Sequence, residues 1–228
     1  MPQRNRRMRN KKIALSRTAR KEIRKIAQDV VDENVEDKRK VYQEENVNIN
    51  HNKPIYIGKF LSDLSQGTST GTDAVKFDVR VGDRIKLKNI NMRFWLSNKK
   101  DRSNVMYKAV LFWYPVDVGG NITDQDVYFT QTNKMLDRYN FKRIKILDTF
   151  IIKPTYNYAL ADNAREHSYL AILNKSWKNK YVQFETNSTK PKGWELGISL
   201  VCYDAFGTLQ TDNIASFAIN SQITFEDA

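Results

Sequence analysis

The stretch "RIKLKNINMRFWL", residues 84–96, decides the fold, because its apolar residues alternate with polar ones as they do in a half-buried β-strand. Ile85 and Leu87 fall on one face, and a second apolar set follows at Ile90, Met92, Phe94 and Leu96. The alternation slips by one residue between Leu87 and Ile90. One extra residue in a strand produces such a slip, so we predict a β-bulge at this point.

The sequence beyond this stretch continues in β pattern. Residues 105–115, "VMYKAVLFWYP", are typical of a mostly buried strand. Further strands are expected in "IKILDTFIIKP" (144–154), "SYLAILNKSW" (168–177), "KYVQFET" (180–186), "WELGISLVCYDAF" (194–206) and "IASFAINSQITFE" (214–226). Turn-rich segments separate the strands, and residues 123–140 are the best candidate for a helix or an irregular connection.

About eight strands without strand–helix alternation predict an all-β fold, either a sandwich or a barrel. A single eight-stranded jelly roll is one standard way to close such a set and to limit its free edges. The pattern does not separate it from an immunoglobulin-like sandwich. The one cysteine, Cys202, excludes the disulfide-linked antibody type, and the apolar residues around it predict that it is buried.

The N-terminal region carries nearly all of the surplus charge. Residues 1–28 contain eleven Lys and Arg and one acid, Glu22, which gives a net +10 of the +12 of the whole chain. A block of like charge repels itself, so we predict that residues 1–15 form a disordered basic arm. Such a block is typical of a segment that meets a polyanion.

Residues 16–40 are predicted to form an amphipathic helix that changes from basic to acidic along its length, and 41–228 are predicted to form the jelly-roll domain. Ser16 or Thr18 is expected to cap the helix. The helix has an apolar stripe at helical spacing that is too narrow to anchor a lone helix in water. We therefore expect the helix to pair with other copies of itself or to become ordered on nucleic acid, and we assign the stripe to helix association. The stripe consists of Ala19, Ile23, Ile26 and Val30.

Nucleic-acid binding is assigned to the arm and the helix, because basic side chains neutralise phosphates without reading sequence. The assigned residues are Arg4, Arg6, Arg7, Arg9, Lys11, Lys12, Arg17, Arg20, Lys21, Arg24 and Lys25. The aromatic strings "RFWL" (93–96) and "LFWYP" (111–115) invite comparison with base-stacking platforms. Because they alternate with other apolar residues, we interpret them as core.

No catalytic residue, metal ligand or cofactor is predicted. His51 and His167 stand in unrelated contexts, and the motifs of hydrolases, phosphate loops and zinc proteases are absent from the sequence. The acids of "TDQD" (123–126) and "EDA" (226–228) suit a structural calcium ion, but we interpret them as a solvated turn and a solvated chain end. Neither a secretory leader nor a membrane span is expected, which favours an aqueous, reducing compartment.

A basic helix followed by a β-sandwich resembles the capsid proteins of small icosahedral viruses. The body is similar to the coat protein of satellite tobacco necrosis virus and to the capsid proteins of small circular single-stranded DNA viruses. The strings that carry the resemblance are "LSDLSQG" (61–67), "RVGDRIKLKNINMRFWL" (80–96), "YKAVLFWYPVD" (107–117) and "MLDRYNFKRIKILDTFIIKP" (135–154). The resemblance therefore covers residues 61–154 in order and is looser toward the C terminus.

The resemblance implies a viral-capsid jelly roll that self-assembles into a T=1 icosahedral shell of sixty copies. It also implies that the helices gather inside the virion near the threefold axes, against packaged single-stranded nucleic acid. The run "RNRRMRNKK" (4–12) resembles a nuclear localisation signal, which suits a DNA genome and host import factors, although packaging alone accounts for it equally well. A cell-surface receptor is a further implied partner. Calcium is held between subunits in some members of the family, and no ligands are assigned here.

Two other classes of function stay open at this point. A cellular β-domain with a basic tail would bind RNA or DNA without forming shells. An enzyme acting on nucleic acid would need a carboxylate or histidine centre that the sequence does not display. A small oligomer of fixed size would favour the β-domain, and closed particles would favour the capsid protein.

Overall fold

The computed structural model describes residues 16–34, 37–67, 78–118, 121–130, 132–153, 167–204 and 208–228. The chain divides into two compact units, with the boundary between Glu36 and Asp37. The first unit contains helix α1 (Arg17–Asn34). The described part of the second contains β1 (Lys38–Asn50), β2 (Ile55–Ile57), β3 (Arg84–Asn98), β4 (Met106–Pro115), η1 (Val116–Val118), α3 (Asp124–Val127), β5 (Lys145–Ile152), β6 (Ser168–Gln183), β7 (Trp194–Tyr203) and β8 (Asn213–Asp227).

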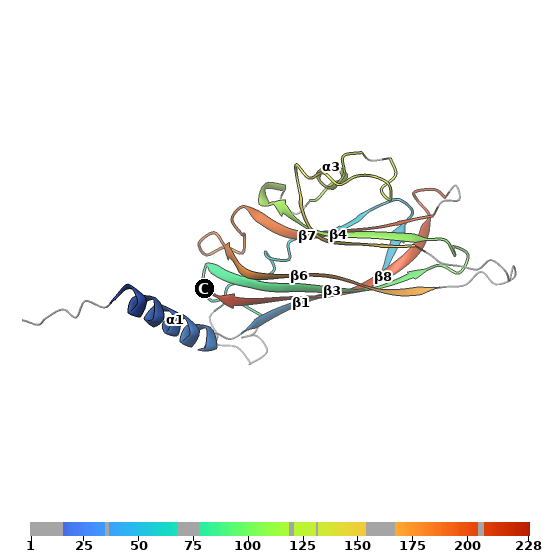
Figure 1. The fold of residues 1–228 in the computed structure, drawn as a ribbon. Coiled ribbons are helices and arrows are strands. Elements are labelled where there is room, and N and C mark those ends of the chain that lie inside the picture. Colours follow the sequence, from blue (N-terminus) through green and yellow to red (C-terminus); the bar gives the residue numbers. More distant parts are fainter. Residues whose placement is uncertain are drawn as a thin grey trace, which may run out of the picture. The chain divides into compact units, whose positions relative to one another are not determined.

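The strands of the second unit form two four-stranded sheets that face each other. One sheet has the order β1-β8-β3-β6 and the other has the order β2-β7-β4-β5. All pairings within them are antiparallel, and Figure 1 shows the two layers. Each described connection except β4–β5 joins a strand of one sheet to a strand of the other. This order is that of an eight-stranded jelly roll, which confirms the predicted fold class.

The β-bulge that the slipped alternation predicts is present in β3. The register of β3 shifts between Leu87 and Asn89 against both of its neighbours, β6 and β8. The extra residue restores the inward direction, so Leu87 and Ile90 are both fully buried. Opposite the bulge, β6 continues unbroken from Ser168 to Gln183, where the sequence predicted two separate strands. The ladder resumes at Lys180 after Ser176, and the polar residues between them are taken up as an irregularity within one strand.

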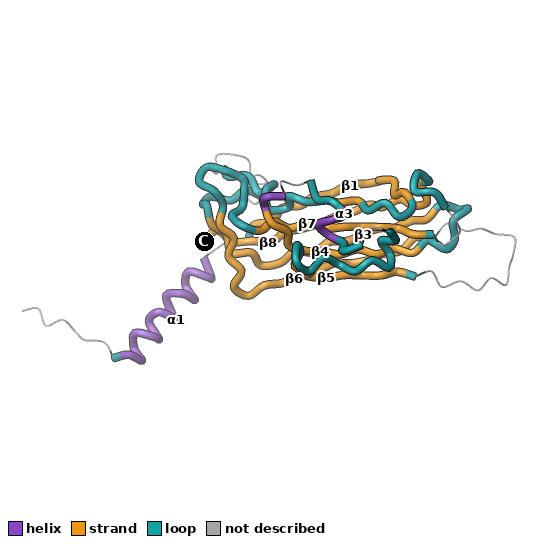
Figure 2. Tube along the Cα trace, turned by 90° about the horizontal axis from the view of Figure 1, so that it is seen from above, coloured by secondary structure: helices purple, strands orange, loops and turns teal. Residues whose placement is uncertain are grey.

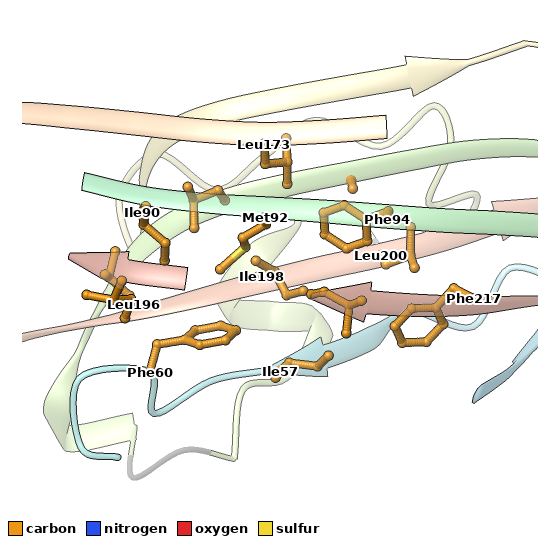
Figure 3. Packing of buried hydrophobic residues seen from close by; sticks show 14 of the residues in the cluster. Ile57, Phe60, Ile90, Met92, Phe94, Leu173, Leu196, Ile198, Leu200 and Phe217 are labelled. Atoms are coloured by element: carbon orange, nitrogen blue, oxygen red, sulfur yellow. The ribbon is translucent and has the colours of Figure 1, made fainter. Parts of the chain in front are cut away.

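The core lies between the two sheets and is built from the inward residues of both. Figure 3 shows Ile90, Met92 and Phe94 of β3 pointing toward Ile198 and Leu200 of β7. All five are completely buried. Each apolar side chain of this size contributes roughly 1.5–3 kcal/mol when it leaves water. The alternation along residues 84–96 therefore buries the apolar side chains of β3 between the two sheets, where they contribute to the hydrophobic stabilisation of the fold.

A second, smaller core lies on the other side of the β2-β7-β4-β5 sheet. The connection between β4 and β5, which carries α3, covers this face (Figures 1 and 2). It packs Ile122, Val127 and Ile144 against Phe112 and Tyr114 of β4. As a result β4 is buried from residue 107 to residue 114, as the sequence predicted for a mostly buried strand.

The helix expected over residues 16–40 ends at Asn34, and Lys38 already belongs to β1. The sequence of β1 contains Lys, Arg and Glu, which favour a helix when nothing else decides. Pairing decides here, because Lys38 lies opposite Phe225 of β8 and its ammonium group forms an ion pair with Asp227. The helix prediction was therefore too long at its C-terminal end.

Candidate nucleic-acid interface

Helix α1 begins at a side-chain cap. The Ser16 hydroxyl accepts a hydrogen bond from the Ala19 N–H at 3.1 Å, and the Ser16 carbonyl accepts one from the Arg20 N–H at 3.0 Å. Ser16 is thus the N-cap, one of the two candidates from the sequence. The first turn contains no acidic side chain. The positive end of the helix dipole and the basic side chains therefore have the same sign, which favours an anionic partner.

The basic and apolar side chains of α1 occupy opposite faces. At about 100° per residue, the predicted stripe from Ala19 to Val30 spans roughly 60° of the helix circumference. The five basic residues are centred on the opposite side and are all exposed, namely Arg17, Arg20, Lys21, Arg24 and Lys25. Within the stripe, Ile23 is 50%, Ile26 62% and Val30 52% exposed. The helix therefore presents one cationic face and one apolar face.

The other six predicted binding residues lie outside the described residues, namely Arg4, Arg6, Arg7, Arg9, Lys11 and Lys12.

The start of the jelly-roll unit is fixed by ion pairs and is close to neutral. Lys88 binds both Asp37 and Glu226, and Lys86 lies 3.3 Å from Glu226. Lys38 binds Asp227 on the neighbouring strand. Hydrogen bonds to Asp37 and Glu226 raise the pKa of Lys88. These three lysines are therefore compensated within the unit.

The carboxylates considered for calcium have other partners in the structure. Asp124 accepts a hydrogen bond from the Tyr56 hydroxyl at 2.6 Å and lies 3.1 Å from the Lys134 ammonium. Asp126 accepts hydrogen bonds from the N–H and hydroxyl of Thr123, which caps α3. Glu226 is 4% exposed, so the interpretation of residues 226–228 as solvated is wrong for this acid, whereas Ala228 is exposed. Among the described residues, no group of three or more His, Cys, Asp or Glu side chains is arranged to hold a metal ion.

Cys202 is fully buried, as predicted, and its thiol points to the carbonyls of Ile49 and Asn50. Burial raises the pKa of this thiol, which disfavours the reactive thiolate. The His51 ring packs at a tilt against the Tyr203 ring, with the ring centres 4.6 Å apart, and its Nδ1 accepts a hydrogen bond from the Asp204 N–H at 3.1 Å. Both groups are therefore used in packing. Within the described ranges, no helix is both long and apolar enough to span a bilayer.

Arg80, the first residue of the string "RVGD", is fixed by contacts to several loops. Its guanidinium is fully buried and donates hydrogen bonds to the carbonyls of Leu64, Gly82 and Ser188. It also lies 4.0 Å from the centre of the Phe184 ring. A single side chain thus joins three separate loops, because a guanidinium carries five donors in a fixed plane.

The "LSDLSQG" segment is fixed in a similar way by Glu195 of β7. Its buried carboxylate accepts hydrogen bonds from the Leu61 N–H at 2.7 Å, from the Ser62 N–H at 3.0 Å and from the Ser62 hydroxyl at 2.6 Å. Burial raises the pKa of Glu195, and these hydrogen bonds oppose that effect. Both motifs therefore position loops of the jelly roll.

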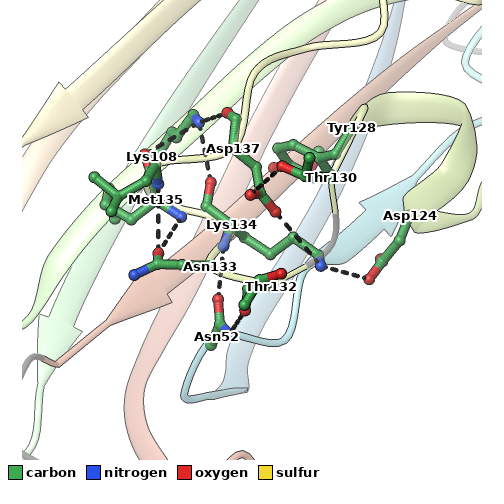
Figure 4. A network of polar contacts seen from close by, with 12 residues as sticks. Asn52, Lys108, Asp124, Tyr128, Thr130, Thr132, Asn133, Lys134, Met135 and Asp137 are labelled. Atoms are coloured by element: carbon green, nitrogen blue, oxygen red, sulfur yellow. Dashed lines mark hydrogen bonds and ion pairs between the residues drawn. The ribbon is translucent and has the colours of Figure 1, made fainter.

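The sequence did not reveal a buried lysine at the centre of the covering connection. Lys108 of β4 donates to the carbonyls of Lys134, Met135 and Asp137 at 2.8–3.2 Å (Figure 4). Burial lowers the pKa of Lys108, and Asp137 opposes the shift. A lysine within an apolar strand could have predicted this network, because a buried ammonium group needs several hydrogen-bond acceptors.

The interpretation of both aromatic strings as core is correct for "LFWYP" and wrong for one residue of "RFWL". Trp113 is 6% exposed, but Trp95 is 53% exposed and lies on the outer face of the β1-β8-β3-β6 sheet. The alternation could have predicted this exposure, because Phe94 and Leu96 face inward and the residue between them must face outward. Trp95 is thus a solvent-exposed aromatic residue that sequence reasoning missed.

Comparison with family models gives no match, and no curated protein matches either. Among solved structures, VP1 of Trichodysplasia spinulosa-associated polyomavirus shows a weak similarity. Its identity to this chain is 8%, over 83% of this chain and 78% of that chain, with a TM-score of 0.12. A TM-score this low supports no argument about this chain.

Proposed function

We propose that this chain is a viral capsid protein that self-assembles into a T=1 icosahedral shell of sixty copies and packages single-stranded nucleic acid. The nucleic acid is bound by the basic arm and by the cationic face of α1. The jelly roll forms the shell. The resemblance found in the sequence implies the copy number and the symmetry, and the fold is compatible with both.

The main support for the proposal is that the surplus positive charge lies in the N-terminal region and not in the jelly-roll unit. Residues 1–28 hold a net +10 of the total +12, and the described part of this region is a helix with its basic side chains exposed. The jelly-roll unit that follows has its lysines at Lys38, Lys86 and Lys88 paired with acids. In a shell of sixty copies, roughly 600 positive charges would then lie on the N-terminal segments and would be available to phosphates.

The apolar stripe of α1 supports association of copies. An isolated helix that exposes Ile23, Ile26 and Val30 at 50–62% of their surface leaves apolar area in water. Burial against the same stripe of other copies removes that area without covering the basic side chains, which lie on the opposite face. We propose that these contacts form inside the shell near its threefold axes. Entry into the host nucleus through residues 4–12 and binding of a cell-surface receptor belong to the same proposal.

The test is sedimentation and negative-stain electron microscopy of the full chain, with and without nuclease. A shell of sixty chains of 26.7 kDa has a protein mass of about 1.6 MDa. The capsid proposal predicts uniform closed particles that protect nucleic acid from digestion. A monomer or small oligomer that binds nucleic acid and releases it as salt rises would overturn the proposal in favour of a cellular β-domain with a basic tail.

A further inference from the structure

Trp95 is held in a defined position on the open face of the β1-β8-β3-β6 sheet. Its indole N–H donates to the Ser97 hydroxyl at 3.1 Å, and this hydroxyl lies 2.8 Å from that of Ser168 on β6. Ser97 is two residues further along the same strand, so the bond draws the indole along the sheet. Half of the side chain nevertheless stays exposed. A fixed aromatic ring with an accessible surface is suited to stacking.

The same face carries hydrogen-bonding side chains beside Trp95. A groove of about 400 Å³ is lined by Asn89, Asn91, Arg93, Asn174, Ser176, Asn220 and Gln222. All of these come from the central strands β3 and β8 and from β6. Amides both donate and accept, which is the chemistry that pairs with the edges of unpaired bases.

The charge on this face is positive where it is not compensated. Arg93 forms no ion pair with any described residue, and the guanidinium carbon of Arg84, at the start of β3, lies 4.1 Å from the centre of the Tyr181 ring. Lys86 and Lys88 of the same strand are paired with Glu226. Arg93 and Trp95 are separated by about 7 Å along the strand and face the same way. A base stacked on the indole therefore has its phosphate within reach of a guanidinium.

We infer that this sheet face is a second binding site for single-stranded nucleic acid, in which a base stacks on Trp95 and its neighbours occupy the amide groove beside Arg93. The inference rests on the proposed function for the nature of its ligand. It adds a site on the jelly roll itself, separate from the arm and α1. Stacking is tolerant of sequence, because every base offers a π-face, so the site suits packaging of a whole genome.

A second copy of the chain is the competing occupant of this face. Val41 at 48% and Tyr181 at 45% are also exposed on this sheet, but its most exposed apolar side chains are Trp95, Leu170 at 75% and Ile172 at 58%. These three side chains are bordered by the amide groove and by Arg93. A stable interface between proteins buries at least about 1,000 Å² and has an apolar centre with few charges. The polar and cationic character of most of the face favours a nucleic acid.

The experiment is photo-cross-linking of the full chain to a 30-nucleotide single strand that contains 5-bromouracil, followed by mapping of the cross-linked peptides. We expect cross-links in β3 around Trp95 in addition to those in residues 1–27. Trp95→Ala should abolish the β3 cross-links and leave the arm cross-links intact, whereas Trp95→Phe should restore them in part. Leu170→Ala removes apolar surface from the same face without removing a π-system, and it should leave the cross-links unchanged.

Affinity gives a second, independent measure in a full chain whose residues Arg4, Arg6, Arg7, Arg9, Lys11 and Lys12 are replaced by Gln. In that background Trp95→Ala should raise the Kd for the oligonucleotide by roughly 5- to 100-fold. Arg93→Gln should weaken binding and reduce its salt dependence, and Arg143→Gln, on the connection over the other sheet, should not.

Several results would overturn the inference. One is a protein that cross-links through the arm and α1 alone, because the packaging proposal would then stand without this site. Another is equal loss of self-association in Trp95→Ala and Leu170→Ala with no β3 cross-link, which would make the face an interface between copies. A chain that retains no oligonucleotide at all would overturn both the proposed function and this inference.

Discussion

The ammonium nitrogen of Lys108 lies 4.6 Å from the centre of the Tyr139 ring. Lys108 belongs to β4, whereas Tyr139 belongs to the connection that covers the sheet. The same ammonium group donates to three carbonyls of that connection. A neighbouring pair acts in the same way, since the Asn52 side-chain oxygen accepts from the Lys134 N–H and its amide donates to the Thr132 carbonyl. The second core therefore depends on polar contacts as well as on apolar packing.

Lys108→Met is expected to lower the free energy of unfolding by about 2–4 kcal/mol. The thioether fits the space of the lysine stem but cannot donate, so the carbonyls of Lys134, Met135 and Asp137 lose their partner while buried. Urea denaturation of the unassembled chain measures the change. Lys142→Met, on the exposed side of the same connection, is the control and should stay within about 0.5 kcal/mol of the parent. Equal stability of the two variants would show that the carbonyls find water instead.

Gly197→Ala is expected to destabilise the jelly roll by about 1–3 kcal/mol through overpacking. A Cβ at this position in β7 would lie 2.9 Å from a ring carbon of Tyr114 and 3.0 Å from the Ile122 methyl group. Both neighbours are buried and have little room to move. Gly82→Ala is the control, because the nearest atom to its added Cβ is at 3.8 Å. A thermal or urea midpoint for Gly197→Ala equal to that of the control would contradict the tight packing against Tyr114.

Several parts of the fold could be predicted from the sequence because they depend on a regular alternation. The alternating apolar residues of β3 predicted the strand, and the shift of this alternation by one residue after Leu87 predicted the bulge. Strand β1 was missed because it is an edge strand whose side chains are mostly half exposed, so its composition of Lys, Glu and Asn carries no apolar alternation. Its pairing with β8, more than 150 residues away, decides its structure. Local sequence does not contain that information.

The candidate site shows the same division. The cap at Ser16 and the two faces of α1 follow from helical spacing, which is a local property. Trp95 needed one further step, namely asking which side of a sheet the residue between two core positions faces. The hydrogen-bond partners of Lys108 and Arg80 could not be predicted from the sequence, because they belong to loops that only the folded chain brings together.

The stability of the jelly roll is expected to fall as the pH is lowered below about 6.5, because of His51. Burial lowers the pKa of His51 in the folded state, Asp204 and Asp212 oppose this shift, and Arg102 adds to it. The unfolded chain therefore takes up the proton first, so stability is lost between the unfolded pKa near 6.5 and the lower folded pKa. The slope from this group is at most about 1.4 kcal/mol per pH unit. Urea denaturation at several pH values between 7 and 5.5 measures it.

His51→Asn is the diagnostic variant for this pH dependence. The Asn side-chain oxygen can accept from the Asp204 N–H as the imidazole Nδ1 does, but it does not titrate. The slope between pH 7 and 5.5 should therefore flatten in His51→Asn and persist in His167→Asn, which removes the other histidine of the chain. The same slope in both variants would assign the pH dependence to other groups.

Replacing Arg4, Arg6, Arg7, Arg9, Lys11 and Lys12 by Gln is expected to reduce packaged nucleic acid while the jelly roll keeps its unfolding midpoint. Each contact to a phosphate of a single strand that is lost reduces the slope of log K against log salt by about 0.7. The measurements are nuclease-protected nucleotides per chain and urea denaturation. A matched loss of charge from the jelly roll, for example at Lys99, Lys100, Lys142, Arg143, Lys190 and Lys192, is the control. Loss of cooperative unfolding in the arm variant would place the arm in the core, contrary to our assignment.

The combined change Ile23→Gln and Ile26→Gln is expected to raise the protein concentration needed for assembly by about tenfold or more. It removes two exposed isoleucines from the stripe of α1, and each contributes on the order of 1 kcal/mol when it is buried against another copy. Glutamine is neutral and is at least as good a helix former as isoleucine, so charge and helix content should be unchanged in circular dichroism. Ala27→Gln, which is exposed on α1 but outside the stripe, is the control and should assemble like the parent. If sedimentation shows the double variant assembling at the parent concentration, helix association does not contribute to the shell. The remaining explanation of the stripe would then be that α1 becomes ordered only when it binds nucleic acid.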